Sequence, residues 1–218
     1  MVGCMSKVAV ILSGSGVFDG SELHETVITM LHLEKLGVKY QTFAPDTQQL
    51  HTIDHSTGEA SEGRNVLVES NRVSRGTTQP LTELNHRDFD ALIFVGGFGA
   101  AKNLSDFAVK GSEYSVIPSI GSVITEFNQN NKWILAMCIA PVLLAKVVSG
   151  SKLTIGSDSG TIEAMATTGV NHVTCSVVES CVDEENKLIT TPAYMLASNL
   201  IELEEGISEA LKLLSSKL

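Results

Sequence analysis

The sequence of 218 residues predicts an open α/β sandwich, with helices on both faces of a mostly parallel sheet. Two observations support this fold class. Apolar runs that are hydrophobic on both faces, such as Val8–Leu12 and Trp133–Met137, are typical of central parallel strands. Stretches with helical periodicity lie between these runs, so strand and helix alternate along the chain. We expect a single domain over residues 1–218, because α/β domains often exceed about 200 residues.

The first half of the chain predicts a strand–helix–strand unit. Val8–Leu12 is followed by Ser13-Gly14-Ser15-Gly16, then by a helical pattern that Gly37 is expected to end. The strand Lys39–Ala44 stops before Pro45, and the crossover should be right-handed. The apolar face of the predicted helix is formed by Leu23, Val27, Met30, Leu31 and Leu33.

Residues 46–90 are polar and carry no sustained helical face. Alternation around Ile53 and again at Val66-Leu67-Val68 predicts a small β-hairpin that turns near Thr57-Gly58. We interpret this segment as an excursion from the sheet within the same domain.

The second half of the chain continues the alternation of strands and helices. An acidic turn, Asp183-Glu184-Glu185-Asn186-Lys187, joins two of the predicted strands. The predicted elements are the strands Ala91–Val95, Trp133–Met137, Cys175–Val182 and Leu188–Thr191, and helices at about Val116–Asn130, from near Pro141, and at Met195–Leu214.

Composition excludes several classes of protein. With 43% hydrophobic and 18% charged residues the chain is expected to be globular. The net charge of −10, from 15 Lys and Arg against 25 Asp and Glu, argues against nucleic acid or an anionic membrane as the main partner. No apolar stretch approaches the roughly 20 residues that span a bilayer, and the apolar core of the N-terminal segment is too short for a signal peptide.

The cysteines favour a reduced protein. Cys4, Cys138, Cys175 and Cys181 form no CxxC pair and no zinc-like spacing, so we expect no disulfide framework and no structural metal. The histidines do not cluster as metal ligands would. The expected location is the cytoplasm.

Three unusual segments follow predicted strands and should meet at the carboxyl edge of the sheet, where open α/β sheets bind ligands. They are Ser13-Gly14-Ser15-Gly16, Gly96-Gly97-Phe98-Gly99 and Met137-Cys138-Ile139-Ala140-Pro141. The first lacks the residues of a phosphate-binding loop and is interpreted as a flexible turn. Glycines of the second could bring backbone N–H groups close to an oxyanion.

Cys138 has two interpretations of about equal weight. A strand that runs directly into a helix places the linking residue on a tight elbow, beside a helix N-terminus that would lower the pKa of a thiol. Alternatively, cysteine is often a small buried residue that ends an apolar strand. Ile139, not a histidine, follows Cys138, and no partner imidazole is evident.

Glu22 and Glu25 are candidate acids near the same edge. Asp19 and Glu22 have the spacing of a capping box, which is a sufficient structural reason for Glu22. Glu25 has no such reason and could point back toward the strand ends. The sequence leaves open which of the two glutamates would act.

Several segments together resemble the ElbB-type proteins of the ThiJ/PfpI superfamily, which have the class I glutamine amidotransferase-like fold. The resemblance spans nearly the whole chain. Its segments include VILSGSGVFDGSELHE (10–25), FAPD (43–46), GEASEGRNVLVES (58–70), VGGFGAAKNLSDFA (95–108), MCIAP (137–141), LTIGSD (153–158) and CVDEENKLITTPAYMLA (181–197).

The resemblance implies a flavodoxin-like three-layer α/β/α sandwich that usually forms a homodimer. It implies an elbow cysteine, Cys138, near a helix glutamate, Glu25, with Glu22 as second choice, and backbone N–H groups of Gly97 and Ile139 as oxyanion donors. Proteases and chaperones of the superfamily have His directly after the nucleophile, and the deglycase-like branch often has a His after the following strand, where this chain has Thr154–Asp158. Peptidase and amidotransferase activities are therefore not expected.

The implied function is that of a cofactor-free, glutathione-independent glyoxalase. It would convert small 2-oxoaldehydes such as glyoxal and methylglyoxal to 2-hydroxy acids, with a loose link to isoprenoid metabolism. The alternative is a redox-sensing or binding protein in which Cys138 is oxidised, its sulfinate held by Glu25, and turnover is incidental.

Overall fold

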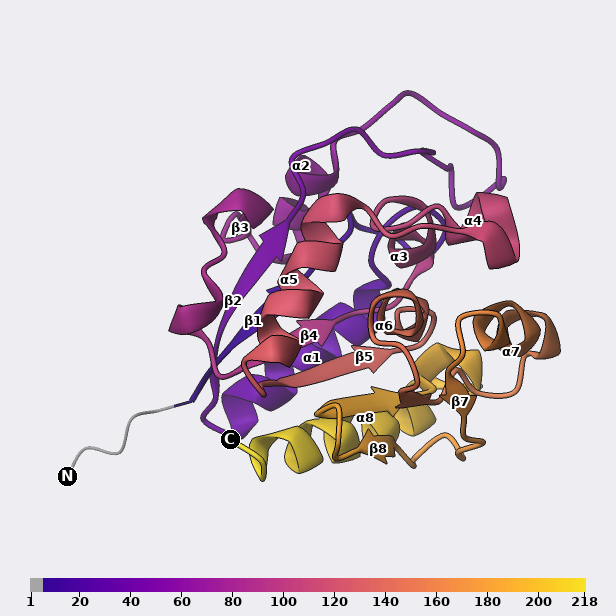
Figure 1. Ribbon diagram of the computed structural model, residues 1–218. Coiled ribbons are helices and arrows are strands. Elements are labelled where there is room, and N and C mark those ends of the chain that lie inside the picture. Colours follow the sequence, from indigo (N-terminus) through magenta and orange to yellow (C-terminus); the bar gives the residue numbers. More distant parts are fainter. Residues whose placement is uncertain (1–5) are drawn as a thin grey trace.

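The computed structural model describes residues 6–218 and places a seven-stranded sheet between two layers of helices (Figure 1). The strand order is β3-β2-β1-β4-β5-β9-β8, and every neighbouring pair is parallel except the antiparallel pair β8–β9. The strands of this sheet are β1 (Lys7–Ile11), β2 (Lys39–Ala44), β3 (Gln79–Pro80), β4 (Ala91–Phe94), β5 (Trp133–Met137), β8 (Cys181–Asp183) and β9 (Leu188–Thr191). A separate pair joins β6 (Lys152–Leu153) to β7 (Asn171–His172). The mostly parallel three-layer sandwich predicted from the sequence is confirmed.

The helices lie on opposite faces of the sheet. In Figure 1, α1 and α8 lie behind the sheet, whereas α5 and α6 lie in front of it. The helices are α1 (Leu23–Lys35), α2 (Val66–Val73), α3 (Phe98–Lys102), α4 (Phe107–Lys110), α5 (Pro118–Gln129), α6 (Pro141–Val147), α7 (Ser159–Ala166) and α8 (Leu200–Ser215).

Two hydrophobic cores result from the alternation of side chains along each strand. In β1, Val8 and Val10 belong to the core that contains Ile207 of α8, whereas Ile11 belongs to the core that contains Phe127 of α5. Because both faces are covered, the central strands β4 and β5 are apolar at every position, and β1 is apolar after Lys7, which is the pattern that predicted them.

The predicted hairpin in residues 46–90 is confirmed in part. Two isolated antiparallel bridges, Ile53–Ala60 and Gln48–Asn65, join the arms on either side of the turn near Thr57-Gly58, but the arms form no continuous strands. The apolar residues 66–68 begin helix α2, because the Asn65 side chain accepts a hydrogen bond from the backbone N–H of Val68 (3.0 Å) and caps the helix.

Two other predicted elements are shorter than expected. The strand expected at Cys175–Val182 is reduced to β8. The last helix begins at Leu200 instead of Met195, because the side chain of Asn199 accepts hydrogen bonds from the backbone N–H groups of Ile201 and Glu202 and caps α8 there.

Helix α1 does not bury the face that its apolar pattern predicted. Leu23, Val27 and Leu31 are exposed, at 41%, 49% and 44% of their surface. The buried residues of α1 are Glu25, Thr26, Thr29, His32 and Leu33. The helix therefore turns polar side chains toward the sheet and α8, and leaves an apolar stripe on the surface.

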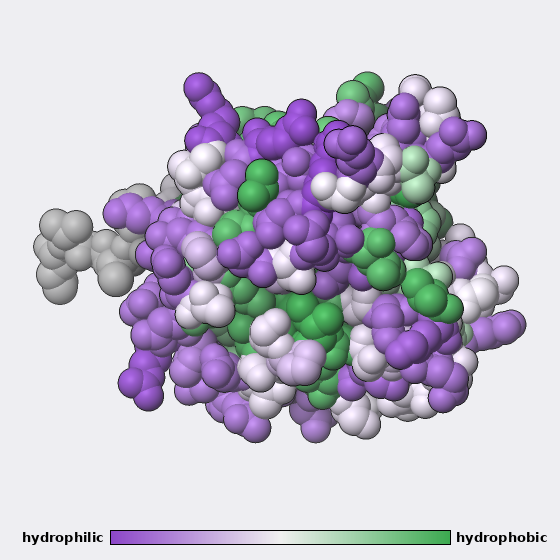
Figure 2. Space-filling model, turned by 90° about the horizontal axis from the view of Figure 1, so that it is seen from above, coloured by the Kyte–Doolittle hydropathy of each residue, from purple (hydrophilic) through white to green (hydrophobic). Residues whose placement is uncertain are grey.

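The face seen in Figure 2 is mostly hydrophilic, with apolar side chains gathered in its middle. Such a mixture is ordinary for a globular protein. None of the helices in residues 6–218 has the length and apolar character that crossing a bilayer requires. Cys4, which entered the expectation about disulfides, lies outside the described residues.

Candidate active site

Cys138 lies on a sharp turn between a strand and a helix. Strand β5 ends at Met137, α6 begins at Pro141, and Cys138 has a φ of 57°, in the left-handed region that is unfavourable for a residue with a side chain. Its backbone N–H donates to the carbonyl oxygen of Thr191 (3.1 Å), which fixes the turn to the end of β9. The geometry is that of the elbow expected from the sequence.

Glu22, not Asp19, caps helix α1. A carboxylate oxygen of Glu22 accepts a hydrogen bond from the backbone N–H of Glu25 (2.8 Å). The predicted capping box with Asp19 is wrong, because Asp19 instead accepts from the backbone N–H of Ile53 (2.7 Å) and fixes the loop after β2. Starting the helix at Leu23 places Glu25 in its first turn with the side chain directed inward.

Glu25 is fully buried and held by two backbone donors. The N–H of Gly96 donates to its Oε2 (3.0 Å), and the N–H of Tyr194 to its Oε1 (3.3 Å). Burial, followed by the negative charge of Glu22, raises the pKa of Glu25 to about 8. The carboxyl group is therefore mostly protonated at neutral pH, and it lies within hydrogen-bonding reach of the Cys138 thiol.

The sulfur of Cys138 is surrounded by the groups that the sequence predicted. The carboxyl group of Glu25 and the backbone N–H groups of Gly97 and Ile139 all approach it. Glu22 is one step removed, since it touches Glu25 and lines the pocket described below. The structure thus brings all five predicted site residues together, with Glu25 as the carboxyl group beside the sulfur.

The expected low pKa of Cys138 is wrong. The residue is 7% exposed, and burial, followed by the charge of Glu25, raises the pKa of the thiol well above its ordinary value. The donors Gly97 and Ile139 act in the opposite direction but have the smaller effect. The sequence showed the elbow but gave no measure of how deeply the sulfur lies.

Two glycines allow this close approach. A Cβ atom at Gly96 would lie 2.4 Å from the Cβ of Cys138 and 2.5 Å from Oε2 of Glu25. Gly97 has a φ of 93°, and a Cβ atom there would lie 2.4 Å from the backbone nitrogen of Glu22. A larger residue at Gly96 would therefore push Cys138 and Glu25 apart, and one at Gly97 would displace the backbone at the start of α1.

Backbone hydrogen bonds join the loop after β1 to the loop after β4. The N–H of Phe98 donates to Val17 (2.7 Å), and the N–H of Glu22 donates to Gly96 (3.0 Å). The glycine-rich loop after β1 therefore supports the loop that presents the Gly97 N–H. This is a structural role, in agreement with the interpretation of that segment as a turn.

A pocket of about 370 Å³ opens beside the sulfur. Its walls are mostly apolar, and the described residues that line it include no histidine. Glu22, Gly97, Cys138 and Ile139 are part of its lining. The remaining lining residues are Val17, Phe98, Ala101, Phe107, Ala108, Asp158, Thr161, Tyr194 and Met195.

Sequence reasoning missed Tyr194 and Asp158. Tyr194 follows β9 and contributes its backbone N–H to Glu25, while its hydroxyl group pairs with Nδ1 of His24 (2.7 Å). Asp158 precedes α7 and caps it through the N–H of Thr161 (2.8 Å). Tyr194 could have been found because open α/β sheets bind ligands at the carboxyl ends of their parallel strands. Thr191 ends such a strand, as Met137 does, and Tyr194 follows it.

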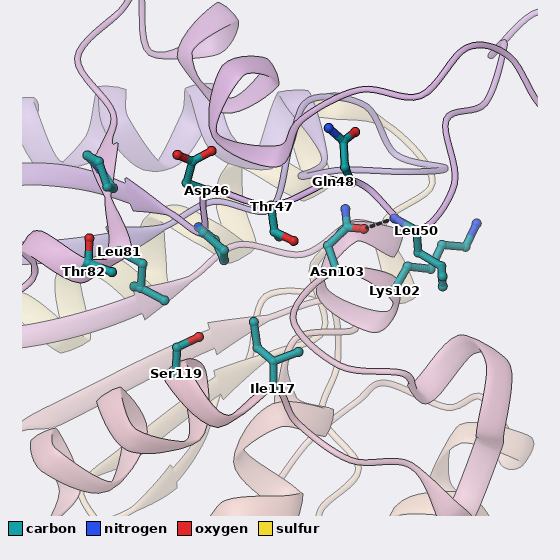
Figure 3. Close-up of a pocket in the computed structure, with 12 residues that line it drawn as sticks. Asp46, Thr47, Gln48, Leu50, Leu81, Thr82, Lys102, Asn103, Ile117 and Ser119 are labelled. Atoms are coloured by element: carbon teal, nitrogen blue, oxygen red, sulfur yellow. Dashed lines mark hydrogen bonds between the residues drawn. The ribbon is translucent and has the colours of Figure 1, made fainter.

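A second cavity of about 530 Å³ lies near the ends of β2 and β3 (Figure 3). Figure 3 shows Asp46, Thr47 and Gln48 on one side and Ile117 with Ser119 on the other. Asn103 crosses toward the loop, where its Oδ1 accepts from the N–H of Leu50 (2.9 Å). This larger cavity contains no cysteine or histidine among its described lining residues, so the chemistry concentrates at Cys138.

Residues 6–218 contain no group of three or more His, Cys, Asp or Glu side chains placed to hold a metal ion. Cys175 and Cys181 are buried free thiols away from the pocket.

Comparison with known proteins gives close relatives. The chain is 46% identical over 213 residues to a human protein named glutamine amidotransferase-like class 1 domain-containing protein 3, mitochondrial, covering 93% of this chain and 80% of the relative. It is 34% identical to the zebrafish (Danio rerio) ES1 protein, mitochondrial, covering 87% of this chain and 77% of that protein. Because these relatives are named as mitochondrial proteins, the expectation of a cytoplasmic location is wrong.

A solved structure confirms the fold. The structure of an isoprenoid biosynthesis protein with an amidotransferase-like domain from Ehrlichia chaffeensis superposes with a TM-score of 0.90 at 33% identity, covering 97% of this chain and 100% of the other. The family model described as DJ-1/PfpI family matches residues 7–202. The chain, with its elbow cysteine and the buried glutamate beside it, therefore belongs to the DJ-1/PfpI family.

Proposed function

We propose that the protein is a cofactor-free glyoxalase that converts small 2-oxoaldehydes to 2-hydroxy acids without glutathione. The observation that carries the proposal is the Cys138 thiol, which lines a pocket of about 370 Å³ and lies beside the buried carboxyl group of Glu25. A thiol and an adjacent acid/base are the two groups that this conversion needs. Membership in the family supports the fold and the site, and the finer activity is our inference.

The first step is addition of sulfur to the aldehyde carbon. Because the thiol of Cys138 has a raised pKa, it gives up its proton during the attack, to the ionised fraction of Glu25. A C–S bond forms, the carbonyl π bond breaks, and the oxygen becomes an alkoxide. The N–H groups of Gly97 and Ile139 lie beside the sulfur and can stabilise this charge, a contribution of about 10²–10³-fold for one donor.

Proton transfer between the two carbons follows. Glu25 gives the proton it took from the thiol to the alkoxide and so becomes ionised again. It then removes the proton from the carbon attached to sulfur and returns it to the neighbouring carbon, while the hydroxyl proton of the first carbon passes to the ketone oxygen of the second, which yields a thioester of the hydroxy acid. Water then cleaves the thioester to release the acid and the thiol. The sum is one aldehyde plus one water giving one hydroxy acid, so no oxidant or cofactor is consumed.

Glu25 is suited to this role because a pKa of about 8 leaves both forms populated near neutral pH. Since no described lining residue is a histidine, no imidazole competes for the task. Such proton transfer contributes about 10²–10⁴-fold to a rate.

The test is consumption of methylglyoxal and glyoxal by purified protein, with lactate and glycolate measured as products. We expect Cys138→Ser to abolish turnover and Cys175→Ser, a change at a buried cysteine outside the pocket, to retain it. Absence of turnover in the unmodified protein, or equal rates for Cys138→Ser, would reject the proposal.

The redox-sensing alternative receives less support. Oxidation by peroxide follows thiolate character and exposure, whereas Cys138 is buried and its thiol has a raised pKa. Selective oxidation of Cys138 by mild peroxide, together with negligible aldehyde turnover, would reverse this preference.

Two further expectations remain proposals. A link to isoprenoid metabolism rests on the description of the Ehrlichia chaffeensis relative. A homodimer is supported by the apolar stripe Leu23, Val27 and Leu31 on α1, which an isolated chain would leave in water. Light scattering of Leu23→Lys, Val27→Lys and Leu31→Lys against unmodified protein tests it.

A further inference from the structure

The charges around the Cys138 pocket all have the same sign. Its lining contains the carboxyl groups of Glu22 and Asp158, and no lysine, arginine or histidine among the described residues. Phe98, Phe107 and Met195 supply apolar wall. Apart from the backbone N–H groups of Gly97 and Ile139 beside the sulfur, the lining thus offers no cationic side chain to pair with an anionic substituent, and it carries two carboxyl groups that oppose one.

The two carboxylates differ in their surroundings. Glu22 is 7% exposed, and its field is therefore weakly screened by solvent. Asp158 is exposed, and its hydrogen bonds from Thr161 lower its pKa, so it stays ionised at neutral pH while salt screens it more. Both side chains are tied in place as helix caps, Glu22 for α1 and Asp158 for α7.

His24 and Lys102 approach the pocket from outside its lining. His24 lies at the surface, with Nδ1 3.8 Å from Glu22 and 2.7 Å from the Tyr194 hydroxyl. Lys102 stands over the Phe98 ring, but its ammonium group donates to the carbonyl oxygen of Phe18 and lines the neighbouring cavities. Neither is part of the pocket lining.

We infer that the pocket selects its substrate by charge: it admits uncharged or cationic aldehydes that carry a small apolar group, and it discriminates against aldehydes that carry a carboxylate or phosphate. The chemistry of the substrate rests on the proposed function, whereas the charge selection applies to any reagent that reaches Cys138. Glu22 and Asp158 are then specificity-determining residues.

The same field has a consequence for the product. A neutral 2-oxoaldehyde becomes an anionic 2-hydroxy acid, so the carboxylates that tolerate the substrate repel what is made from it. Release of the acid is favoured, and lactate should inhibit weakly.

The test compares two alkylating reagents of nearly equal size, neutral iodoacetamide and anionic iodoacetate. The rate of modification of Cys138 is followed by peptide mass spectrometry, and the ratio of the two rates is divided by the same ratio for free glutathione. We expect Cys138 to prefer iodoacetamide by roughly tenfold beyond the small thiol, the order of magnitude for like charges in a partly buried site. Added salt should reduce this preference.

Substitutions test whether Glu22 and Asp158 cause the preference for the neutral reagent. Glu22→Gln and Asp158→Asn remove the charges but keep an oxygen that can cap the helix, and together they should bring the ratio close to that of glutathione. Glu163→Gln is the matched control, since it removes one exposed carboxylate from α7 outside the pocket and should leave the ratio unchanged.

Each result separates this inference from the proposed function. Aldehyde turnover with a rate ratio equal to that of glutathione, or an elevated ratio that Glu163→Gln abolishes and the pocket variants do not, overturns the charge selection alone. An elevated ratio without aldehyde turnover supports the selection and rejects the glyoxalase. Failure of both reagents to modify Cys138 overturns both, because the thiol would then not react with small electrophiles.

Discussion

Replacing Glu25 by glutamine should change how the stability of the protein depends on pH. Glu25 has an ordinary pKa of 4.5 in the unfolded chain and a pKa of about 8 when buried in the fold. Below pH 4.5 both states hold the proton, and between these values only the unfolded state releases it. The contribution of Glu25 to stability is therefore present at low pH and is lost as the pH rises toward 8.

The size of this effect follows from the two pKa values. One proton bound by the folded state but not by the unfolded state changes the free energy of unfolding by about 1.4 kcal/mol per pH unit. Over the interval from 4.5 to about 8 the total is about 5 kcal/mol. That is a large part of the free energy of unfolding of a typical domain, which is roughly 5–15 kcal/mol.

Glutamine does not reproduce the hydrogen bonds of the carboxyl group. The N–H groups of Gly96 and Tyr194 both need an acceptor, and the amide offers only one oxygen. Glu25→Gln should therefore be less stable by about 1–3 kcal/mol from this cause, but the loss does not vary with pH.

The assay is urea unfolding of both proteins at several values between about pH 5 and about pH 8.5. Every other titrating group is present in both chains, so the difference between the curves reports on Glu25 and on Cys138, whose pKa Glu25 raises. We expect the variant to gain on the unmodified protein by about 1.4 kcal/mol per pH unit up to about pH 8. Parallel curves would mean that Glu25 is ionised in the fold, which would refute both its raised pKa and its role as the acid of the site.

The kcat/KM for methylglyoxal should rise with pH up to about 8 and then level off, since the ionised form of Glu25 takes the thiol proton, and a profile flat from about pH 6 to about pH 9 would contradict this. Gly96→Ala should abolish turnover and lower the free energy of unfolding in urea by several kcal/mol, because the added Cβ would meet Cys138 and Glu25. The control, Gly121→Ala in α5, adds a Cβ into open space and should raise the free energy of unfolding by about 0.5–1 kcal/mol. Tyr114→Phe should lower the melting temperature, because it removes a buried hydrogen bond of 2.6 Å to the carbonyl oxygen of Val142 and so about 1–2 kcal/mol of stability. An unchanged melting temperature would show that the stability of α6 does not depend on this hydrogen bond.

The strands that carry the site could be predicted because their signal is local. Trp133–Met137 is apolar at every position, and the structure has a strand over the same residues, so the elbow at Cys138 followed from the chain alone. By contrast, an apolar run of three residues at 66–68 fits either a strand or a helix. The Asn65 cap and tertiary packing make this run the start of helix α2.

The choice between Glu22 and Glu25 depended on where α1 begins. A shift of one residue in a helix start rotates each side chain by about a quarter turn, and no local pattern fixed that start. The pKa of Cys138 depended on burial by loops that are distant in the chain, including Gly97 and Tyr194, so its direction did not follow from residues 137–141.

Because the backbone at Cys138 is left-handed, substitutions at this position can separate the cost of the conformation from the contribution of the side chain. Serine, alanine and cysteine meet the same steric restriction at φ 57°, so stability differences among them report only on the atoms beyond Cβ. Glycine alone escapes the restriction. A protein with glycine there should therefore recover stability relative to alanine while it loses its reactive atom, which would show that the fold tolerates an unfavourable conformation in order to hold a sulfur at that point.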